Sequence, residues 1–182
     1  MDALITREEL ETYLNTEIPP ATADLLIELA TGVVQGVTGQ RIVAATSTEV
    51  VDATYPARTL ELTQYPIREV SNVVLEGQTI EDYKLVRQRL WRKAGWAAQL
   101  SEPSRIEVTY LHGYDPDDRH LATARKVVLT LCAAGVGNPE QVRSESIDDY
   151  RVTYSEALSR MDVPELVRDE LIRVYGRTAY VT

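Results

Sequence analysis

The sequence is poor in the residues on which many small catalytic and metal sites depend. Its 182 residues include one cysteine, Cys132, and two histidines, His112 and His120. A single cysteine excludes a disulfide within the chain and a zinc site built from several thiolates. Phenylalanine is absent, whereas tyrosine occurs ten times. Tyrosine combines an apolar ring with a polar tip and is common at protein interfaces.

Basic residues are also scarce. The chain has 19 lysines and arginines against 28 aspartates and glutamates, a formal net charge of −9. Non-specific binding to nucleic acid depends on releasing counterions to a basic surface, which argues against such a protein here. The apolar runs are too short to cross a bilayer, and the opening MDALITREEL is charged and amphipathic, unlike a secretory signal. We therefore expect a soluble, intracellular protein with a single domain over residues 1–182.

The hydrophobic pattern predicts a mainly α-helical α+β fold, a helical bundle with an inserted β-hairpin or small antiparallel sheet. Thr6 followed by Glu9 predicts a capping box at the first helix. In the second helix we expect one buried stripe that includes Leu25 and Leu29. The predicted order is N-terminal helices in 1–40, a β-rich insert in 41–114, C-terminal helices with a short strand near 150–154 in 115–176, and a tail in 177–182.

Within the insert, alternation sets the expected inward faces. RIEVTYL places Ile106, Val108 and Tyr110 on one side of a strand and polar residues on the other. REVSNVVLEGQTI predicts two strands joined by a turn in which Gly77 takes positive φ.

The turn HGYDPDD is the one place where a catalytic or metal site suggests itself. The two histidines flank it, and Asp115, Asp117 and Asp118 gather in it. A calcium loop that begins there would need Gly at its sixth position and Glu at its twelfth, where the chain has His120 and Lys126. Acidic residues are also favoured in a solvated turn that opens a helix. We therefore expect no catalytic, cofactor-binding or metal-ligating residue, with a small metal-dependent hydrolase as the enzyme alternative.

One stretch runs against the acidic average. Residues 84–101 contain no acidic residue but hold five basic residues and both tryptophans: Lys84, Arg87, Arg89, Arg92, Lys93, Trp91 and Trp96. Two interpretations remain open. The stretch is a hairpin whose basic side faces solvent and whose tryptophans cover the core, or it is a contact patch, since Arg and Trp are frequent in binding hot spots.

Several segments, taken in order, resemble the head-to-tail connector (adaptor) family of long-tailed bacteriophages and prophages. They are YPIREVSNVVLEGQTIEDYKL, LWR, IEVTYLHGYDPDD and, after a helix, NPEQVRSESIDDYRVTYSE with a C-terminal helix, and together they cover about residues 60–176. Residues 41–58 do not follow the pattern. The resemblance implies a helical bundle with an inserted hairpin or small sheet, no enzymatic activity and no cofactor.

The resemblance also implies a structural virion protein, made in the cytoplasm of a host bacterium and located in the neck at the head–tail interface. Copies would form a dodecameric ring at the portal vertex that joins the portal protein to a stopper or tail-completion protein. Genomic DNA would pass through its channel without sequence-specific binding, and no membrane would be involved. An acidic wall lets phosphates slide, which fits the net charge. Another neck protein, a stopper or tail terminator, is the main alternative.

The polar stretch VRSESIDDYRVTYSE, residues 142–156, lies between two predicted helices. Tyr150, Val152 and Tyr154 alternate with polar residues, which predicts a strand anchored to the core. Under the resemblance, the preceding residues face a neighbouring subunit: Arg143, Ser144, Glu145 and Ser146. An ordered loop with contacts only inside the chain is the alternative.

The end of the chain supplies the predicted portal contact. The tail after Gly176 has no evident intrachain role in the sequence, and a free end can order against a partner. The residues assigned to this contact are Tyr175, Arg177 and Tyr180. The basic stretch is the second candidate, with Arg89, Trp91, Arg92 and Trp96 expected to touch the portal or another neighbour.

Overall fold

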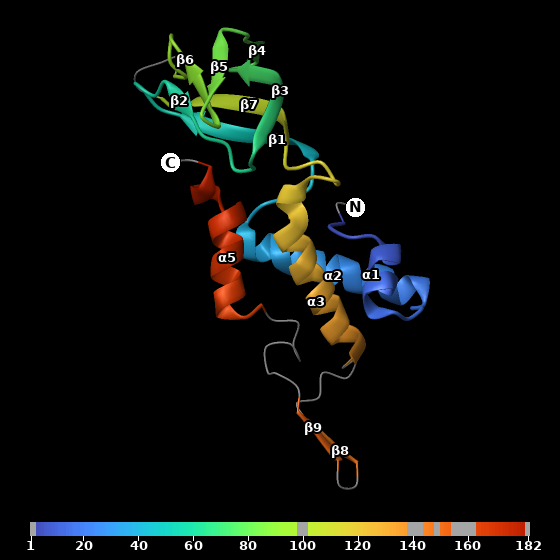
Figure 1. Ribbon diagram of the computed structural model, residues 1–182. Coiled ribbons are helices and arrows are strands. Elements are labelled where there is room, and N and C mark those ends of the chain that lie inside the picture. The colour runs from blue at the N-terminus through green and yellow to red at the C-terminus, as the bar shows by residue number, and fades with distance from the viewer. Residues whose placement is uncertain (1–2, 98–101, 138–143, 148–149, 154–162, 181–182) are drawn as a thin grey trace. The chain divides into compact units, whose positions relative to one another are not determined.

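The computed structural model describes residues 3–97, 102–137, 144–147, 150–153 and 163–180, and it has the expected α+β class (Figure 1). Its helices are α1 (Arg7–Leu14), α2 (Pro20–Thr38), α3 (Ala122–Gly137) and α5 (Glu165–Tyr175), with 3-10 turns η1 (Arg119–Leu121) and η2 (Arg177–Ala179). The chain forms two compact units, a helical unit of residues 1–39 and 116–174 and a β unit of residues 40–115 and 175–182. The β unit therefore contains the predicted insert and also takes in the end of the chain.

The helical unit begins with the predicted capping box. Thr6 Oγ1 accepts a hydrogen bond from the Glu9 amide at 3.2 Å, and Glu9 Oε2 accepts one from the Thr6 amide at 2.7 Å. The same helix is tied to its two neighbours by ion pairs, from Arg7 to Asp24 on α2 and from Glu9 to Arg125 on α3. The helices α1, α2 and α3 thus contact one another pairwise. None of the described helices is both long and apolar enough to cross a membrane.

The buried face of α2 differs from the predicted stripe. Leu25 and Leu29 were expected in the core, but their exposed fractions are 55% and 48%. The side that packs inward carries mostly smaller residues, namely Ala23, Ile27, Ala30, Thr31, Val34 and Thr38. The helix is apolar on more than one side, so periodicity does not select which side faces α1 and α3. The prediction was therefore wrong for both leucines.

The β unit holds two antiparallel sheets where the sequence predicts a hairpin or one small sheet. The first has the order β1-β7-β3-β4 and consists of β1 (Ala45–Ala53), β7 (Ser104–His112), β3 (Ile67–Leu75) and β4 (Gln78–Thr79). The second has the order β2-β6-β5 and consists of β2 (Thr59–Leu60), β6 (Arg89–Arg92) and β5 (Tyr83–Val86). One apolar core contains side chains of both sheets, among them Leu60, Leu62, Val73, Leu90, Trp96, Ile106, Val108 and Tyr110.

The predicted alternation of β7 is confirmed. Ile106, Val108 and Tyr110 are fully buried, and the residues between them face outward. β7 lies between β1 and β3, and all three side chains belong to the unit's apolar core, where burial of an aliphatic side chain contributes about 1.5–3 kcal/mol. The turn from β3 to β4 has Gly77 at φ +80°, as predicted. Gly113, at φ +84° after β7, is required sterically, because a Cβ there would stand 2.6 Å from the Val43 carbonyl oxygen.

Two further strands lie in the polar stretch between α3 and α5. β8 (Ser144–Ile147) and β9 (Tyr150–Thr153) pair antiparallel, with Ser144 opposite Thr153 and Ile147 opposite Tyr150. β9 falls where alternation predicts a strand. The structure describes both strands by their backbone alone.

Candidate functional site

The two histidines have different structural roles. His112 is fully buried at the end of β7, where its Nε2 lies 2.9 Å from Ser47 Oγ and its ring lies 5.4 Å from that of Tyr110. His120 is exposed in η1, where its Nδ1 lies 2.7 Å from Asp118 Oδ1. His112 is a core residue of the β unit, and His120 belongs to the start of a helix.

The acidic residues of the turn are engaged locally. Asp115 accepts two hydrogen bonds from the Arg68 guanidinium, at 2.6 and 2.8 Å. Asp118 accepts the His120 amide at 2.9 Å, and this hydrogen bond, together with the one to the imidazole, holds the pKa of Asp118 below its usual range. Within the described ranges no three His, Cys, Asp or Glu side chains are grouped to hold a metal ion. In the described residues, the histidines and aspartates of this turn therefore do not form the metal site that the hydrolase alternative would need.

Cys132 lies buried in α3. Burial raises the pKa of its thiol to about 11, so at neutral pH it is almost wholly protonated. Because the thiolate is the nucleophilic form, this buried cysteine has a packing role.

The arginines predicted as contact residues on β6 form ion pairs inside the β unit. Arg89 Nε lies 3.2 Å from Glu61 Oε1, and Arg92 Nε lies 2.7 Å from Asp82 Oδ1. The Arg92 side chain is only 16% exposed. The Asp82 carboxylate is exposed, and its hydrogen bond to Arg92 lowers its pKa. These ion pairs tie β6 to Glu61, which follows β2, and to Asp82, which precedes β5. The predicted contact of these arginines with the portal or another neighbour stays a prediction.

The two tryptophans of this stretch differ in burial. Trp96 is fully buried and its Nε1 donates a hydrogen bond to the Arg58 carbonyl oxygen at 3.0 Å. Trp91 is half-buried on β6. Trp96 therefore covers the core, as the first interpretation of this stretch expects, and a role in binding would fall to other residues.

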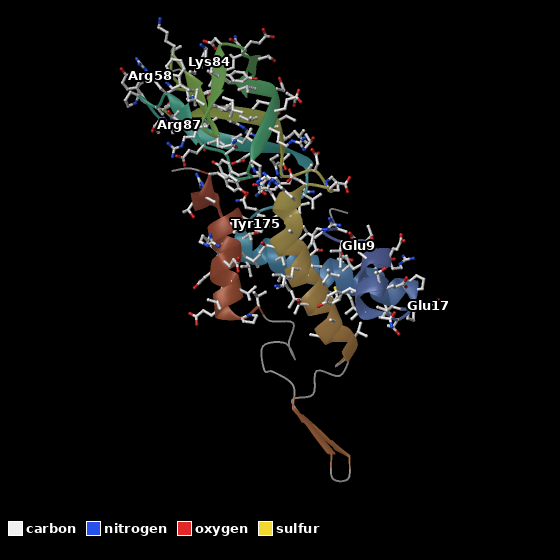
Figure 2. All side chains as sticks on the ribbon, in the orientation of Figure 1. Glu9, Glu17, Arg58, Lys84, Arg87 and Tyr175 are labelled. Carbon is white, nitrogen blue, oxygen red and sulfur yellow. The ribbon has the colours of Figure 1, made fainter. Side chains whose placement is uncertain are left out.

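Four exposed basic residues surround this hairpin, and we call them the basic patch: Arg58, Lys84, Arg87 and Lys93. They form no ion pair in the part of the chain that the structure describes. Figure 2 shows Arg58, Lys84 and Arg87 at the same end of the β unit. Arg87 stands in the two-residue turn between β5 and β6 at φ +46°, next to Gln88 at φ +62°. Composition alone places Lys84, Arg87 and Lys93 in the basic stretch of residues 84–101, and Arg58 lies outside that stretch.

The end of the chain packs on the β unit. The ring of Tyr180 stacks on that of Tyr65, with centroids 5.7 Å apart and planes 10° apart. Its hydroxyl lies 3.0 Å from that of Tyr114, and Tyr114 in turn meets Tyr175 edge to face at 6.5 Å. Burial raises the pKa of Tyr180 far above its ordinary value, so the hydroxyl remains neutral. The four tyrosines fix the tail, which therefore has the intrachain role that the sequence does not reveal.

Two of the residues predicted to contact the portal have partners inside the chain. Tyr175 is 1% exposed, and Arg177 forms an ion pair of 2.6 Å with Glu61. Contact between the tail and a portal protein stays a prediction, but its argument from a free end is wrong. Deleting residues 177–182 would remove the stacking on Tyr65 along with any contact surface.

We expect Tyr180→Ala to lower the free energy of unfolding of the β unit by about 1–2 kcal/mol, because it removes a half-buried ring and its stacking. Urea denaturation followed by circular dichroism measures this. Tyr55→Ala is the matched control, since Tyr55 is 61% exposed, and its effect should stay within about 0.5 kcal/mol. Equal effects of the two substitutions would contradict the packing described for the tail.

The structure gives no side-chain contacts for the residues predicted at the subunit interface. Arg143 lies outside the described residues. Ser144, Glu145 and Ser146 lie on β8, whose side chains are not described. Their role at an interface stays a prediction.

Comparisons with known proteins give matches only at the level of structure. No family model and no curated protein matches the sequence. The fold is similar to a chain from the neck of an empty gene transfer agent (GTA) particle computed with C6 symmetry, with a TM-score of 0.58 and 13% identity over 89% of this chain and 91% of that one.

A second similar chain comes from the neck of a native GTA particle computed with C12 symmetry. Its TM-score is 0.55 and its identity 15%, over 87% of this chain and 88% of that one. These matches span nearly the whole length of the chains on both sides. The protein therefore has a fold that occurs in the necks of phage-like particles.

Proposed function

We propose that this protein is a structural subunit of the neck of a bacteriophage or phage-like particle, in which copies assemble into a ring. The observation that carries the proposal is the similarity of fold to chains of two GTA necks, which covers 89% and 87% of this chain. Since fold alone does not determine function, the proposal also needs support from the residues themselves.

The order of the sequence segments gives that support independently of the fold comparison. YPIREVSN, LWR, IEVTYLHGYDPDD and VRSESIDDYRVTYSE occur in the order that resembles the connector family. The acidic turn and Cys132 both have structural roles in the described part of the chain. A non-enzymatic, architectural protein is consistent with both observations.

In its finer form, the proposal is a connector ring of twelve copies between the portal protein and a stopper or tail-completion protein. The neck computed with C12 symmetry supports twelve. DNA would pass through the ring, and the net charge of −9 would favour sliding over binding, because an acidic wall repels phosphates.

Removal of the chain from a strain that produces the particles tests the proposal. We expect DNA-filled heads without attached tails, and restoration of complete particles by the wild-type chain supplied in trans. Normal tailed particles in the deletion strain would contradict a neck role.

Complementation with His120→Ala and Asp117→Asn separates the structural role from the hydrolase alternative. Both side chains are exposed in the turn, so the fold should tolerate their replacement. A neck subunit should complement fully, whereas a hydrolase that uses His120 and Asp117 should not.

A further inference from the structure

We infer that copies of this chain associate through the basic patch of one copy and the acidic outer surface of α1 and α2 of the next. The inference deepens the proposed function, because it assigns the two surfaces that a ring of identical subunits needs. A ring closes through a heterologous contact, in which each subunit uses two different surfaces.

Charge is distributed very unevenly along the chain. Residues 1–40 contain seven acidic residues and one basic residue, Arg7, whereas residues 84–97 contain five basic residues and no acidic one. In α1 and α2, Arg7 neutralises Asp24, and Glu9 pairs with Arg125 of α3. Glu8, Glu17 and Glu28 are exposed and form no ion pair within the described ranges. In the inferred contact, these three acids of one copy would meet the four basic-patch residues of the next.

Exposed apolar side chains accompany both charged surfaces. Of the nine large apolar residues that the described structure exposes, three belong to α1 and α2 (Tyr13, Leu25 and Leu29), and three are within three positions of a basic-patch residue in the sequence (Tyr55, Leu85 and Val86). Interfaces combine an apolar centre with charged surroundings, which is the composition of both surfaces.

The geometry of each surface favours contact. Leu25, Glu28 and Leu29 stand at i, i+3 and i+4 of α2 and therefore share one helix face. The positions where Gly32 and Gly36 would carry a Cβ have no atom within 4 Å, so the same face continues flat and open. On the other surface, Lys84 to Arg87 occupy the edge strand β5 and its turn, and the exposed Leu85 and Val86 stand between the two cations in the sequence.

A second copy fits these surfaces better than nucleic acid does. The basic patch by itself would suit phosphates, but a chain with net charge −9 repels a polyanion at longer range. Nucleic acid would also leave Leu85, Val86 and the acidic surface without a partner. One contact between copies covers both surfaces at once.

Paired charge reversals test this contact in the purified full-length chain. The hairpin variant carries Lys84→Glu and Arg87→Glu, and the helix variant carries Glu17→Lys and Glu28→Lys. Sedimentation velocity over a concentration series at low salt measures self-association. We expect wild-type association that weakens as salt is added, and an association constant at least about tenfold lower for each variant alone.

Mixing the two variants is the decisive step. The acidic hairpin of the hairpin variant can meet the basic helix surface of the helix variant. The unchanged basic hairpin of the helix variant can meet the unchanged acidic helix surface of the hairpin variant. An equimolar mixture should therefore regain wild-type association. The variants carry net charges of −13 and −5, four units either side of −9, so general attraction between them cannot produce the recovery. A contact within one chain would be broken in both variants and would not be repaired by mixing.

Lys126→Glu combined with Arg105→Glu is the matched control, because it gives the same net charge as the hairpin variant at exposed sites outside both surfaces. It should associate like the wild type. All substitutions are at exposed positions, and urea denaturation checks that each variant has a wild-type midpoint.

Three results would overturn the inference: unchanged association of either variant, failure of the mixture to recover, or a wild-type chain that stays monomeric at about 1 mM and low salt. None of them bears on the neck role, which the deletion strain tests separately. A chain that is required for tail attachment but whose charge variants associate normally would keep the proposed function and lose this contact.

Discussion

Trp96→Ala is expected to lower the free energy of unfolding of the β unit by about 3–5 kcal/mol, the cost typical of removing a large aromatic side chain from a core. Trp96 is fully buried among residues of both sheets, and its ring centroid lies 6.5 Å from that of Tyr83. Its indole N–H donates to the Arg58 carbonyl oxygen and its amide donates to that of Ala57, at 3.0 and 2.9 Å. Alanine would leave a cavity between the sheets, and the Arg58 carbonyl oxygen would keep only its hydrogen bond from the Arg92 amide.

Trp91→Ala is the matched control for this prediction, because Trp91 lies five residues earlier in the same unit and is half-buried. We expect its effect to be well under half of that of Trp96→Ala. Urea denaturation followed by far-ultraviolet circular dichroism compares the two without relying on tryptophan fluorescence. If Trp91 proved the more important of the two for stability, the core described for the β unit would be wrong.

Glu49→Ala is expected to destabilise the β unit by about 1–2 kcal/mol, since it would remove the acceptor of the buried Tyr110 hydroxyl and of two exposed Thr63 donors. Glu49 Oε2 accepts hydrogen bonds from the Thr63 amide and hydroxyl, both at 3.0 Å, and from the Tyr110 hydroxyl at 2.9 Å. Burial raises the pKa of Tyr110 far above its ordinary value, so its hydroxyl remains a donor at all physiological pH values. One carboxylate oxygen thereby joins β1, β7 and the segment after β2.

Two companion variants test this network. Glu107→Ala removes an exposed carboxylate from the outer face of β7 and should change stability by no more than about 0.5 kcal/mol. A double-mutant cycle of Glu49→Ala with Tyr110→Phe should show a coupling energy of about 1 kcal/mol or more, because the two side chains are bonded directly. Strictly additive effects would contradict the hydrogen bond between them.

Features that depend on local rules could be predicted from the sequence. The capping box of Thr6 and Glu9 needs only residues three positions apart, and the inward face of β7 follows from strict alternation. The turn at Gly77 follows from one residue's freedom to take positive φ. In each case, the information lies within a few residues of the feature.

Features that depend on distant partners could not be predicted. The tail is held by Tyr65 and Tyr114, which lie 115 and 66 positions before Tyr180, and no local pattern indicates that stacking. The exposure of Leu25 and Leu29 is likewise decided by which side of α2 meets its neighbours.

The candidate site shows the same division. Composition alone marks residues 84–101 as a basic stretch with two tryptophans, but it does not distinguish members with structural partners from exposed ones. The structure assigns Arg89 and Arg92 to ion pairs and Trp96 to the core, which moves the interaction hypothesis to the basic patch. The basic patch and the acidic face of α2 can be identified only when the charges are considered together with the burial of each side chain.

Cryo-electron microscopy of the particles from the producing strain, compared with particles from the deletion strain, tests the neck role most directly. The account predicts a ring at the portal vertex into which the fold of this chain fits, with twelvefold order, and its loss in the deletion strain. A vertex with the same density in both strains, or a chain found elsewhere in the particle, would contradict it.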